Sequence, residues 1–351
     1  MKRYIAKRFF KENFSFLLDM SAVKKILILL AVTALIFILS TGLGDMNIKP
    51  WTVLAVFFGG GEELEQLVVK SFRLPRIIIA LLAGMSLAIA GALLQGMVRN
   101  PLASPDIIGI TGGAGAAVVG FLAFFSDENN ALTVSIQWLP LAAFAGAAIV
   151  AFLVYFLAWK NGVSPVRLVL IGIGVSALMQ AIITMLMILG PIFRASQANI
   201  WITGTVNASN WTDVYILLPW TLILITIAFV LARNVNIQEL GEEIATGVGS
   251  HIQRQRIILL TLATGLVGGA VAFAGGIGFV GLMAPHMARR LVGSSFGALL
   301  PVAALLGGTL VMVADLIGRT MFLPLEVPAG VFTAAIGAPY FIYLLFKTNN
   351  A

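Results

Sequence analysis

Long apolar runs separated by short polar segments make up most of this chain. Because a helix needs about 20 mainly apolar residues to cross the hydrocarbon of a bilayer, each run predicts a membrane-spanning helix. The runs lie near residues 25–43, 75–97, 106–126, 137–159, 167–190, 214–232, 257–275, 278–290, 297–320 and 327–347. The eighth is too short to cross alone, so we expect it to begin or end inside the protein. The pattern predicts an all-α integral membrane protein with about ten transmembrane helices.

One polar segment, Arg233–Arg256, differs from the other loops because its charges are closely spaced. They include Glu239, Glu242, Glu243, Arg254 and Arg256. Unpaired ions are costly in hydrocarbon, so this segment must lie in water.

Within the polar segment, apolar residues recur at three- and four-residue steps, which predicts one face of a short helix. They are Ile237, Leu240, Ile244 and Val248, with the glutamates on the opposite face. Gly247 and Gly249 end this helix, and Ser250 can cap a second one that runs to Arg256. Two short amphipathic helices at about residues 237–256 indicate a docking surface for a soluble partner.

The distribution of basic residues predicts the side of the membrane that this segment faces. With ten spans both termini lie on one side, and sixteen of the 22 Lys and Arg residues fall in segments on that side. The six on the other side are Lys49, Lys70, Arg73, Arg76, Arg194 and Arg319. Because cytoplasmic loops carry the excess of Lys and Arg, we expect the termini and the polar segment to be cytoplasmic.

The composition narrows the function classes. The 351 residues are 60% hydrophobic and 11% charged, far below the charged fraction of soluble domains. The absence of cysteine excludes disulfides, thiolate metal sites and cysteine nucleophiles. A net charge of +7 would suggest nucleic acid as a partner of a soluble protein, but here the positive-inside effect accounts for it, and we expect no nucleic-acid partner.

Residues 1–24 form a basic amphipathic segment ahead of the membrane domain at 25–351. Its cations, Lys2, Arg3, Lys7, Arg8 and Lys11, are interleaved with Tyr4, Phe9, Phe10, Phe14 and Phe16. This pattern is typical of an interfacial helix lying on anionic membrane lipid.

The turn Asn100–Asp106 holds two prolines, Pro101 and Pro105, which fix the backbone between the second and third spans. It is either a rigid connector or a gate element, a stiff re-entrant corner that places Leu102 across a central pathway.

Two groups of charges lie at the outer ends of spans. Asp315 and Arg319 are four residues apart and can pair on one helix face, unless Arg319 extends outward towards an acidic partner. Arg73 and Arg76 begin the second span, where they either anchor it at the interface or dock a partner.

The remaining motifs argue against catalysis by this chain. The pattern Gly276-Ile277-Gly278-Phe279-Val280-Gly281 matches a dinucleotide fingerprint but lacks its strand and its acidic residue, and no GxxxxGK[ST] phosphate loop occurs. His286 has only His251 as a second histidine, so we predict no metal site. No span holds paired carboxylates or a nucleophile with a base, which disfavours a membrane enzyme. Only Asp315 could couple an ion, which disfavours an ion-driven secondary transporter.

Several segments together resemble the FecCD-type permeases of ABC importers for iron-siderophores, haem and cobalamin. They are Arg73-Leu74-Pro75-Arg76, Gly91 to Gln95, Asn100 to Pro105, Gly113 to Gly115, Leu240 to Ala245 with Gly247 and Gly249, Gly278 to Leu282 with Pro285, His286 and Arg289, Ala314 and Asp315 with Arg319, and Gly337 to Pro339. The resemblance covers nearly the whole chain from residue 70 onward.

This resemblance implies a type II ABC importer permease in a bacterial cell membrane. It implies a dimer with a second permease copy or a sister permease, ABC ATPase subunits that bind ATP-Mg below, and an extracytoplasmic substrate-binding protein above. Iron-siderophore is the expected substrate, with cobalamin or haem as the alternative, and we expect this chain itself to bind no cofactor.

The resemblance also implies roles for residues. Arg73 and Arg319 would dock the binding protein, and Asn100 and Leu102 would form the gate. The ATPase-coupling set would be Glu239, Leu240, Glu242, Glu243, Ile244, Ala245, Gly247 and Arg254. His286 belongs to a family motif for which the sequence suggests no physical role.

Overall fold

The computed structural model describes residues 4–9, 14–127, 131–160, 162–190 and 192–348. Its long helices are α1 (Met20–Gly42), α4 (Leu74–Val98), α6 (Ile110–Phe124), α7 (Leu139–Ala158), α8 (Pro165–Leu189), α10 (Trp211–Glu239), α12 (Ile252–Ala274), α14 (Phe296–Thr320) and α15 (Ala329–Thr348). The shorter ones are α2 (Pro50–Phe57), α3 (Glu63–Leu67), the π-helical turn η1 (Val68–Arg73), α5 (Pro105–Ile108), the 3₁₀ turn η2 (Ile136–Trp138), α9 (Ile192–Thr203), α11 (Glu242–Gly247) and α13 (Val280–Val292).

Each of the ten predicted spans falls on a helix. In the described part of the chain, seven helices are long and apolar enough to cross a membrane, namely α1, the continuous stretch Glu63–Val98, α7 with η2, α8, α10, α12 and α14. The third and tenth runs form the shorter apolar helices α6 and α15, and the eighth forms the 13-residue α13. The all-α membrane fold is confirmed, while ten complete crossings stay a prediction.

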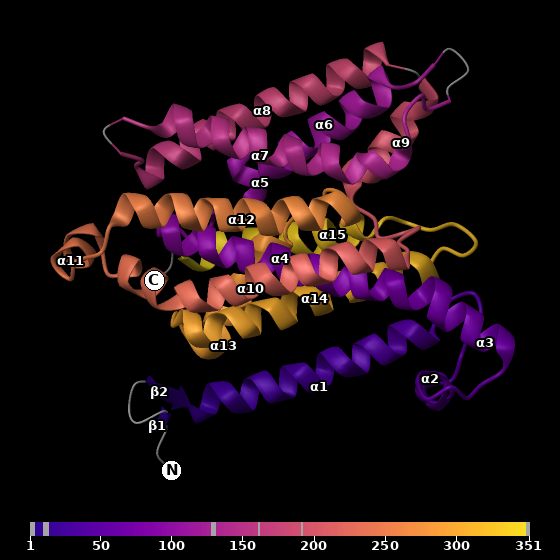
Figure 1. The fold of residues 1–351 in the computed structure, drawn as a ribbon, viewed down its shortest axis with the longest axis horizontal. Coiled ribbons are helices and arrows are strands. Elements are labelled where there is room, and N and C mark those ends of the chain that lie inside the picture. The colour runs from indigo at the N-terminus through magenta and orange to yellow at the C-terminus, as the bar shows by residue number, and fades with distance from the viewer. Residues whose placement is uncertain (1–3, 10–13, 128–130, 161, 191, 349–351) are drawn as a thin grey trace.

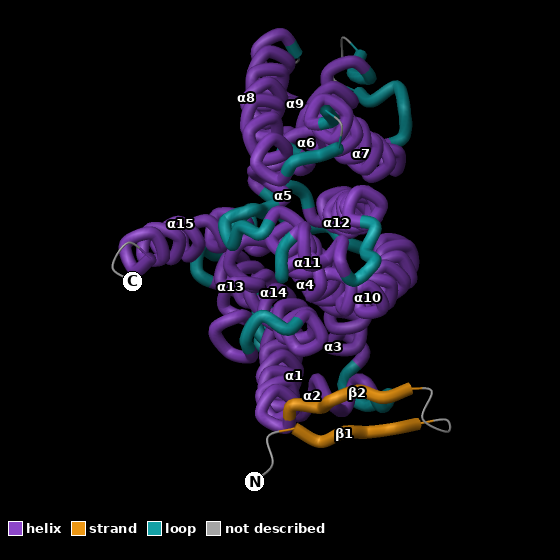
Figure 2. Tube along the Cα trace, turned by 90° about the vertical axis from the view of Figure 1, so that its left-hand side faces the viewer, coloured by secondary structure: helices purple, strands orange, loops and turns teal. Residues whose placement is uncertain are grey.

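The helices lie in three layers, seen from the side in Figure 1 and end-on in Figure 2. The outer layers are α6 to α9 and α1 with α2 and α3, and between them α4 is surrounded by α10, α12, α13 and α14. Small residues let α4 approach its neighbours: a Cβ on Gly84 would collide with the Gly307 carbonyl oxygen, and one on Gly91 would collide with that of Gly281. The bundle is therefore held by close backbone packing around one buried helix.

The N-terminal segment differs from the prediction. Instead of an interfacial helix, Tyr4–Phe9 (β1) and Phe14–Asp19 (β2) form an antiparallel hairpin. Aromatic and β-branched residues favour strands, and the Asp19 side chain caps α1 by accepting from the Ser21 amide at 2.9 Å, which ends the strand.

The polar segment also differs in its helix boundaries. Helix α10 continues through Arg233 to Glu239, so only α11 is a separate short helix, and the second predicted helix is the first turns of α12. Gly241 separates α10 from α11 with φ of 115°, a left-handed backbone that favours glycine. Ser250 is not the cap of α12: the cap residue is His251, and the Ser250 hydroxyl has no hydrogen-bond partner among the described residues.

Candidate functional site

Helix α11 presents an apolar surface at one end of the bundle, the end that also holds the β1–β2 hairpin in Figure 1. Leu240, Ile244 and Val248 are 63%, 54% and 66% exposed, with exposed Glu243 beside them, whereas Ala245 is buried against the bundle. We call Leu240, Glu243, Ile244, Gly247 and Val248 the α11 surface. Apolar side chains gathered on a segment that lies in water are typical of a protein-docking site.

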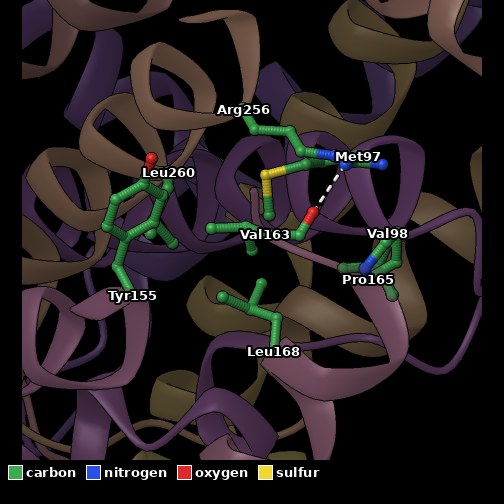
Figure 3. Close-up of a pocket in the computed structure, with 8 residues that line it drawn as sticks. All are labelled: Met97, Val98, Tyr155, Val163, Pro165, Leu168, Arg256 and Leu260. Carbon is green, nitrogen blue, oxygen red and sulfur yellow. Dashed lines mark hydrogen bonds between the residues drawn. The ribbon is translucent and has the colours of Figure 1, made fainter. Parts of the chain in front are cut away.

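Glu242 pairs with two arginines of the bundle, although its side chain is 46% exposed. Its Oε1 accepts from Arg256 at 2.5 Å and from Arg99 at 3.5 Å. Arg256 is only 4% exposed and also donates to the Val163 carbonyl at 2.6 Å, which ties it to the α7–α8 loop (Figure 3). Glu242 therefore links α11 to α12 and to Arg99, where α4 ends and the Asn100–Asp106 turn begins.

Glu239 makes a second link, through α13. It accepts from Arg289 of that helix at 2.8 Å. At the other end of α13, the Phe279 amide donates to Asp106 Oδ2 at 3.4 Å, and Thr111 donates to Asp106 Oδ1 at 2.7 Å. Helix α13 thus connects the end of α10 with the turn that contains Asp106.

His286 of α13 has a partner that the sequence did not suggest. Its Nδ1 lies 2.8 Å from the Tyr340 hydroxyl of α15. This hydrogen bond attaches α13 to α15, and no group of three or more metal-ligating side chains occurs among the described residues.

Two hydrogen bonds hold the Asn100–Asp106 turn. The Asn100 side chain accepts from the Leu102 amide at 2.9 Å, and the Asn100 carbonyl accepts from the Ala103 amide at 3.1 Å. Asn100 and Leu102 are half-buried, and α5 lies between the central and outer layers in both views (Figures 1 and 2). The turn therefore re-enters the bundle, which fits either role considered for it.

A cavity of about 490 Å³ lies beside this turn. Its polar lining includes Asp106, Thr111, Ser176 and Gln180, from α5, α6 and α8. Trp201 of α9, Phe279 at the start of α13 and Phe341 of α15 complete the wall. Asp106 was not singled out from the sequence, because the expectations for the turn concerned Asn100 and Leu102. Asp106 comes after Pro101 and Pro105 and directly before an apolar run. This position in the sequence could have identified it as a cavity residue.

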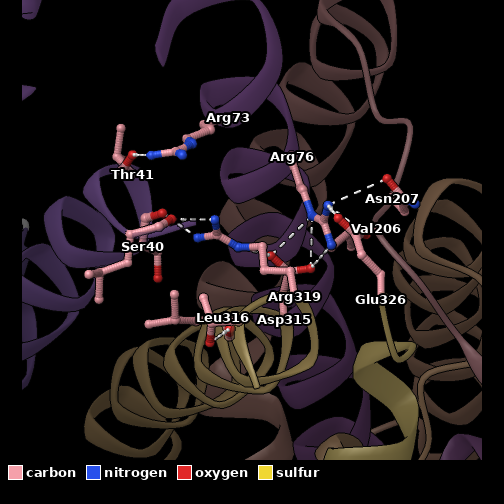
Figure 4. A network of polar contacts seen from close by, with 12 residues as sticks. Ser40, Thr41, Arg73, Arg76, Val206, Asn207, Asp315, Leu316, Arg319 and Glu326 are labelled. Carbon is pink, nitrogen blue, oxygen red and sulfur yellow. Dashed lines mark hydrogen bonds and ion pairs between the residues drawn. The ribbon is translucent and has the colours of Figure 1, made fainter. Parts of the chain in front are cut away.

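A network of charges occupies the opposite end of the bundle (Figure 4). The predicted pair is confirmed, with Arg319 Nε 3.3 Å from Asp315 Oδ2. Arg76 joins it, since its guanidinium lies 2.8 Å from Asp315 and 3.0 Å from Glu326. Asp315 is therefore shared between two arginines and is not a free ion-coupling carboxylate.

The two arginines expected to dock a partner, Arg73 and Arg319, are only 8% and 6% exposed. Arg73 donates to the carbonyls of Thr41 and Gly42 at 2.9 and 2.8 Å, and Arg319 donates to those of Ser40 and Leu43. Both guanidinium groups thus satisfy carbonyls at the end of α1. Together with Arg76, Asp45 and Glu326 they line a depression of about 260 Å³.

Comparison with known proteins identifies the family. The model of the FecCD transport family matches residues 5–347. The chain belongs to this family. Among curated FecCD-family relatives, YfhA of Bacillus subtilis, named a siderophore transport system permease protein, is 62% identical over 325 residues, 93% of this chain and 95% of that protein. The achromobactin transport system permease protein CbrC of Dickeya dadantii is 45% identical, covering 96% and 95%.

A solved structure agrees with the assignment to the FecCD family. An inward-facing structure described as a metal-chelate type ABC transporter superposes with a TM-score of 0.82 at 29% identity, covering 93% of this chain and 99% of that one. This multi-pass membrane protein is therefore a permease subunit with the architecture of an ABC transporter.

Proposed function

We propose that this FecCD-family chain moves an iron-siderophore chelate from an extracytoplasmic binding protein into the cytoplasm, driven by ATP hydrolysis on partner ATPase subunits. The observation that carries the proposal is the exposed apolar surface of α11 on a permease without a phosphate loop of its own. Relatives named for siderophore, achromobactin and iron(3+)-hydroxamate transport support the substrate class.

The ATPase would bind the α11 surface in the cytoplasm. The loop charges support this orientation, because the basic excess lies on the side of the termini and α11. Leu240, Ile244 and Gly247 would provide the contact, with Glu243 setting its register. Buried Ala245 would hold α11 against the bundle.

Closure of the ATPases on ATP would move α11, and two ion pairs would transmit the movement. Glu242 would act through Arg99 on the Asn100–Leu102 gate, and Glu239 would act through Arg289 and α13 on Asp106. The gate and the cavity of about 490 Å³ would then open alternately as neighbouring helices rock as rigid bodies.

The pathway would run along the cavity, whose polar groups lie at a depth where polar residues are normally functional. A second permease copy or a sister permease would close it on the side of α8 and α15. The binding protein would dock at the opposite end of the bundle, where Arg73 and Arg319 line a depression with Arg76.

Uptake of a radioactive ferric siderophore by proteoliposomes tests the proposal. The vesicles would contain the chain with its co-purifying ATPase and binding protein. We expect uptake only when ATP is present on the side of the membrane that carries the ATPase and siderophore-loaded binding protein is present on the opposite side. Uptake driven by an ion gradient without ATP would contradict it.

A further inference from the structure

We propose that an anionic phospholipid binds in a groove between α7, α10 and α12, with one acyl chain in the groove and its headgroup at Arg254. The groove has a volume of about 610 Å³, within the range of sites that hold small molecules. Its lining includes Phe152 of α7, Ile227 of α10 and Ile257, Ile258 and Thr261 of α12. The lining holds no charged side chain, as expected of a site for an acyl chain.

An aromatic pair narrows one end of the groove. The rings of Phe144 and Trp220 meet edge to face at 5.4 Å, and Trp220 Nε1 donates to the Gly265 carbonyl at 2.9 Å. A Cβ on Gly268 would lie 2.8 Å from the Phe144 ring, so glycine at this position allows the aromatic pair to pack against α12. Helices α7 and α10 lie on either side of α12 (Figure 1). The groove lining extends along them from this pair to Ile257 and Ile258, towards the start of α12.

The positively charged side chain of Arg254 lies at the end of the groove nearest α11. Arg254, Ile258, Thr261 and Gly265 recur at three- and four-residue steps, so Arg254 continues the face of α12 that lines the groove. Arg254 is exposed, and no hydrogen bond or ion pair joins it to another residue of the described chain. Exposed Trp159, whose ring lies 5.8 Å from that of Tyr155, flanks this end as interfacial tryptophans commonly do.

The dimensions fit one leaflet. Eleven residues separate Arg254 from Gly265, which is about 16 Å of helix and about half the hydrocarbon thickness. With its headgroup at Arg254, the lipid would therefore extend its acyl chain as far as the aromatic pair of Phe144 and Trp220. The walls of the groove are membrane-spanning helices, so the groove is surrounded by membrane lipid. The unpaired cation at Arg254 favours an anionic headgroup over a zwitterionic one.

Native mass spectrometry of the full-length chain in mild detergent tests the site. Equal amounts of phosphatidylglycerol and phosphatidylcholine with identical acyl chains are added, and the retained lipid is counted. We expect one phosphatidylglycerol per chain, preferred about five-fold. With Arg254→Gln the preference should disappear, because the charge that selects the headgroup is gone.

A matched pair of variants on α7 separates this groove from the general lipid shell. Ala148 lines the groove, whereas Ala145 is exposed on the same helix outside it. Ala148→Phe should abolish the retained phosphatidylglycerol, and Ala145→Phe should keep it. Equal retention by these two variants, or no headgroup preference in the unmodified chain, would overturn the proposal. So would a second copy of the chain in place of the lipid, seen as a dimer that Ala148→Phe alone dissociates.

Discussion

At the scale of single residues, the glutamates of the polar segment have different surroundings although the sequence grouped them. Glu242 pairs with buried Arg256, and Glu243 is exposed on the α11 surface. We predict that Glu242→Ala lowers stability by about 1–2 kcal/mol, since it removes a hydrogen bond to a buried charged group, although the Glu242 side chain is itself 46% exposed. Glu243→Ala should change stability by less than about 0.5 kcal/mol but weaken ATPase attachment.

Thermal unfolding in detergent measures the stability of the Glu242→Ala and Glu243→Ala variants, and co-purification measures how much ATPase stays attached to each. Glu242→Ala should keep the ATPase attached while uptake per ATP hydrolysed falls, because its link to Arg99 is lost. If the two variants lose stability and ATPase to the same extent, the distinction between an inner and an outer glutamate is wrong.

The arginines at the opposite end give a second prediction at this scale. If Arg73 and Arg319 steer the binding protein, Arg73→Gln with Arg319→Gln should slow its association about ten-fold at low salt, and raising salt should reduce the difference. Lys49→Gln, an exposed cation at the same end, is the control and should change the rate less than two-fold. Surface plasmon resonance on the detergent-solubilised chain gives the rates, and an unchanged rate for the double variant refutes the docking role.

The burial of these two arginines also marks a limit of sequence reasoning. Their position at a span end was predictable, and so was the spacing of Asp315 and Arg319. Their partners were not, because the carbonyls of Ser40 to Leu43 come from α1, about 30 residues from Arg73 and far from Arg319 along the chain. Only packing of α1 against α14 and η1 brings these groups together.

At the scale of elements, hydrophobic periodicity located the ten apolar helices but not their ends or the shorter pieces. Helix α10 runs past its apolar part to Glu239, because Glu239 and Gln238 find partners on α13 and α12. Helix α9 was missed because Ile192–Thr203 mixes polar and apolar residues and is too short to read as a span. The hairpin was missed because its basic and aromatic residues also fit an interfacial helix.

Helix α13 gives a prediction at this scale. If it transmits movement between α10, α15 and Asp106, loss of its bond to α15 should uncouple uptake from ATP hydrolysis. Tyr340→Phe removes the hydroxyl bonded to His286, worth about 1 kcal/mol, and should lower uptake per ATP by up to about five-fold.

Tyr215→Phe is the matched control for this tyrosine variant. Tyr215 is exposed on α10, and its hydroxyl has no hydrogen-bond partner among the described residues. Proteoliposome uptake measured together with phosphate release gives the ratio for each variant. An equal ratio for Tyr340→Phe and Tyr215→Phe would mean that the bond only stabilises the helices.

At the scale of the whole molecule, the orientation predicted from the loop charges would assign the two ends of the bundle to their proposed partners, and the absence of cysteine makes this orientation directly measurable. Glu63 is exposed in α3, and Ser294 is exposed between α13 and α14. In Figure 1, α3 and α11 lie at opposite ends of the bundle, and α13 lies at the α11 end. Both lie outside the α11 surface, so a bound ATPase need not cover them. Single variants Glu63→Cys and Ser294→Cys therefore report one end each. With a membrane-impermeant maleimide, we expect Glu63→Cys to react in right-side-out vesicles and Ser294→Cys only in inverted ones. The reverse labelling would place α11 outside the cell, where no ATPase could reach it, and would refute the coupling role of the polar segment.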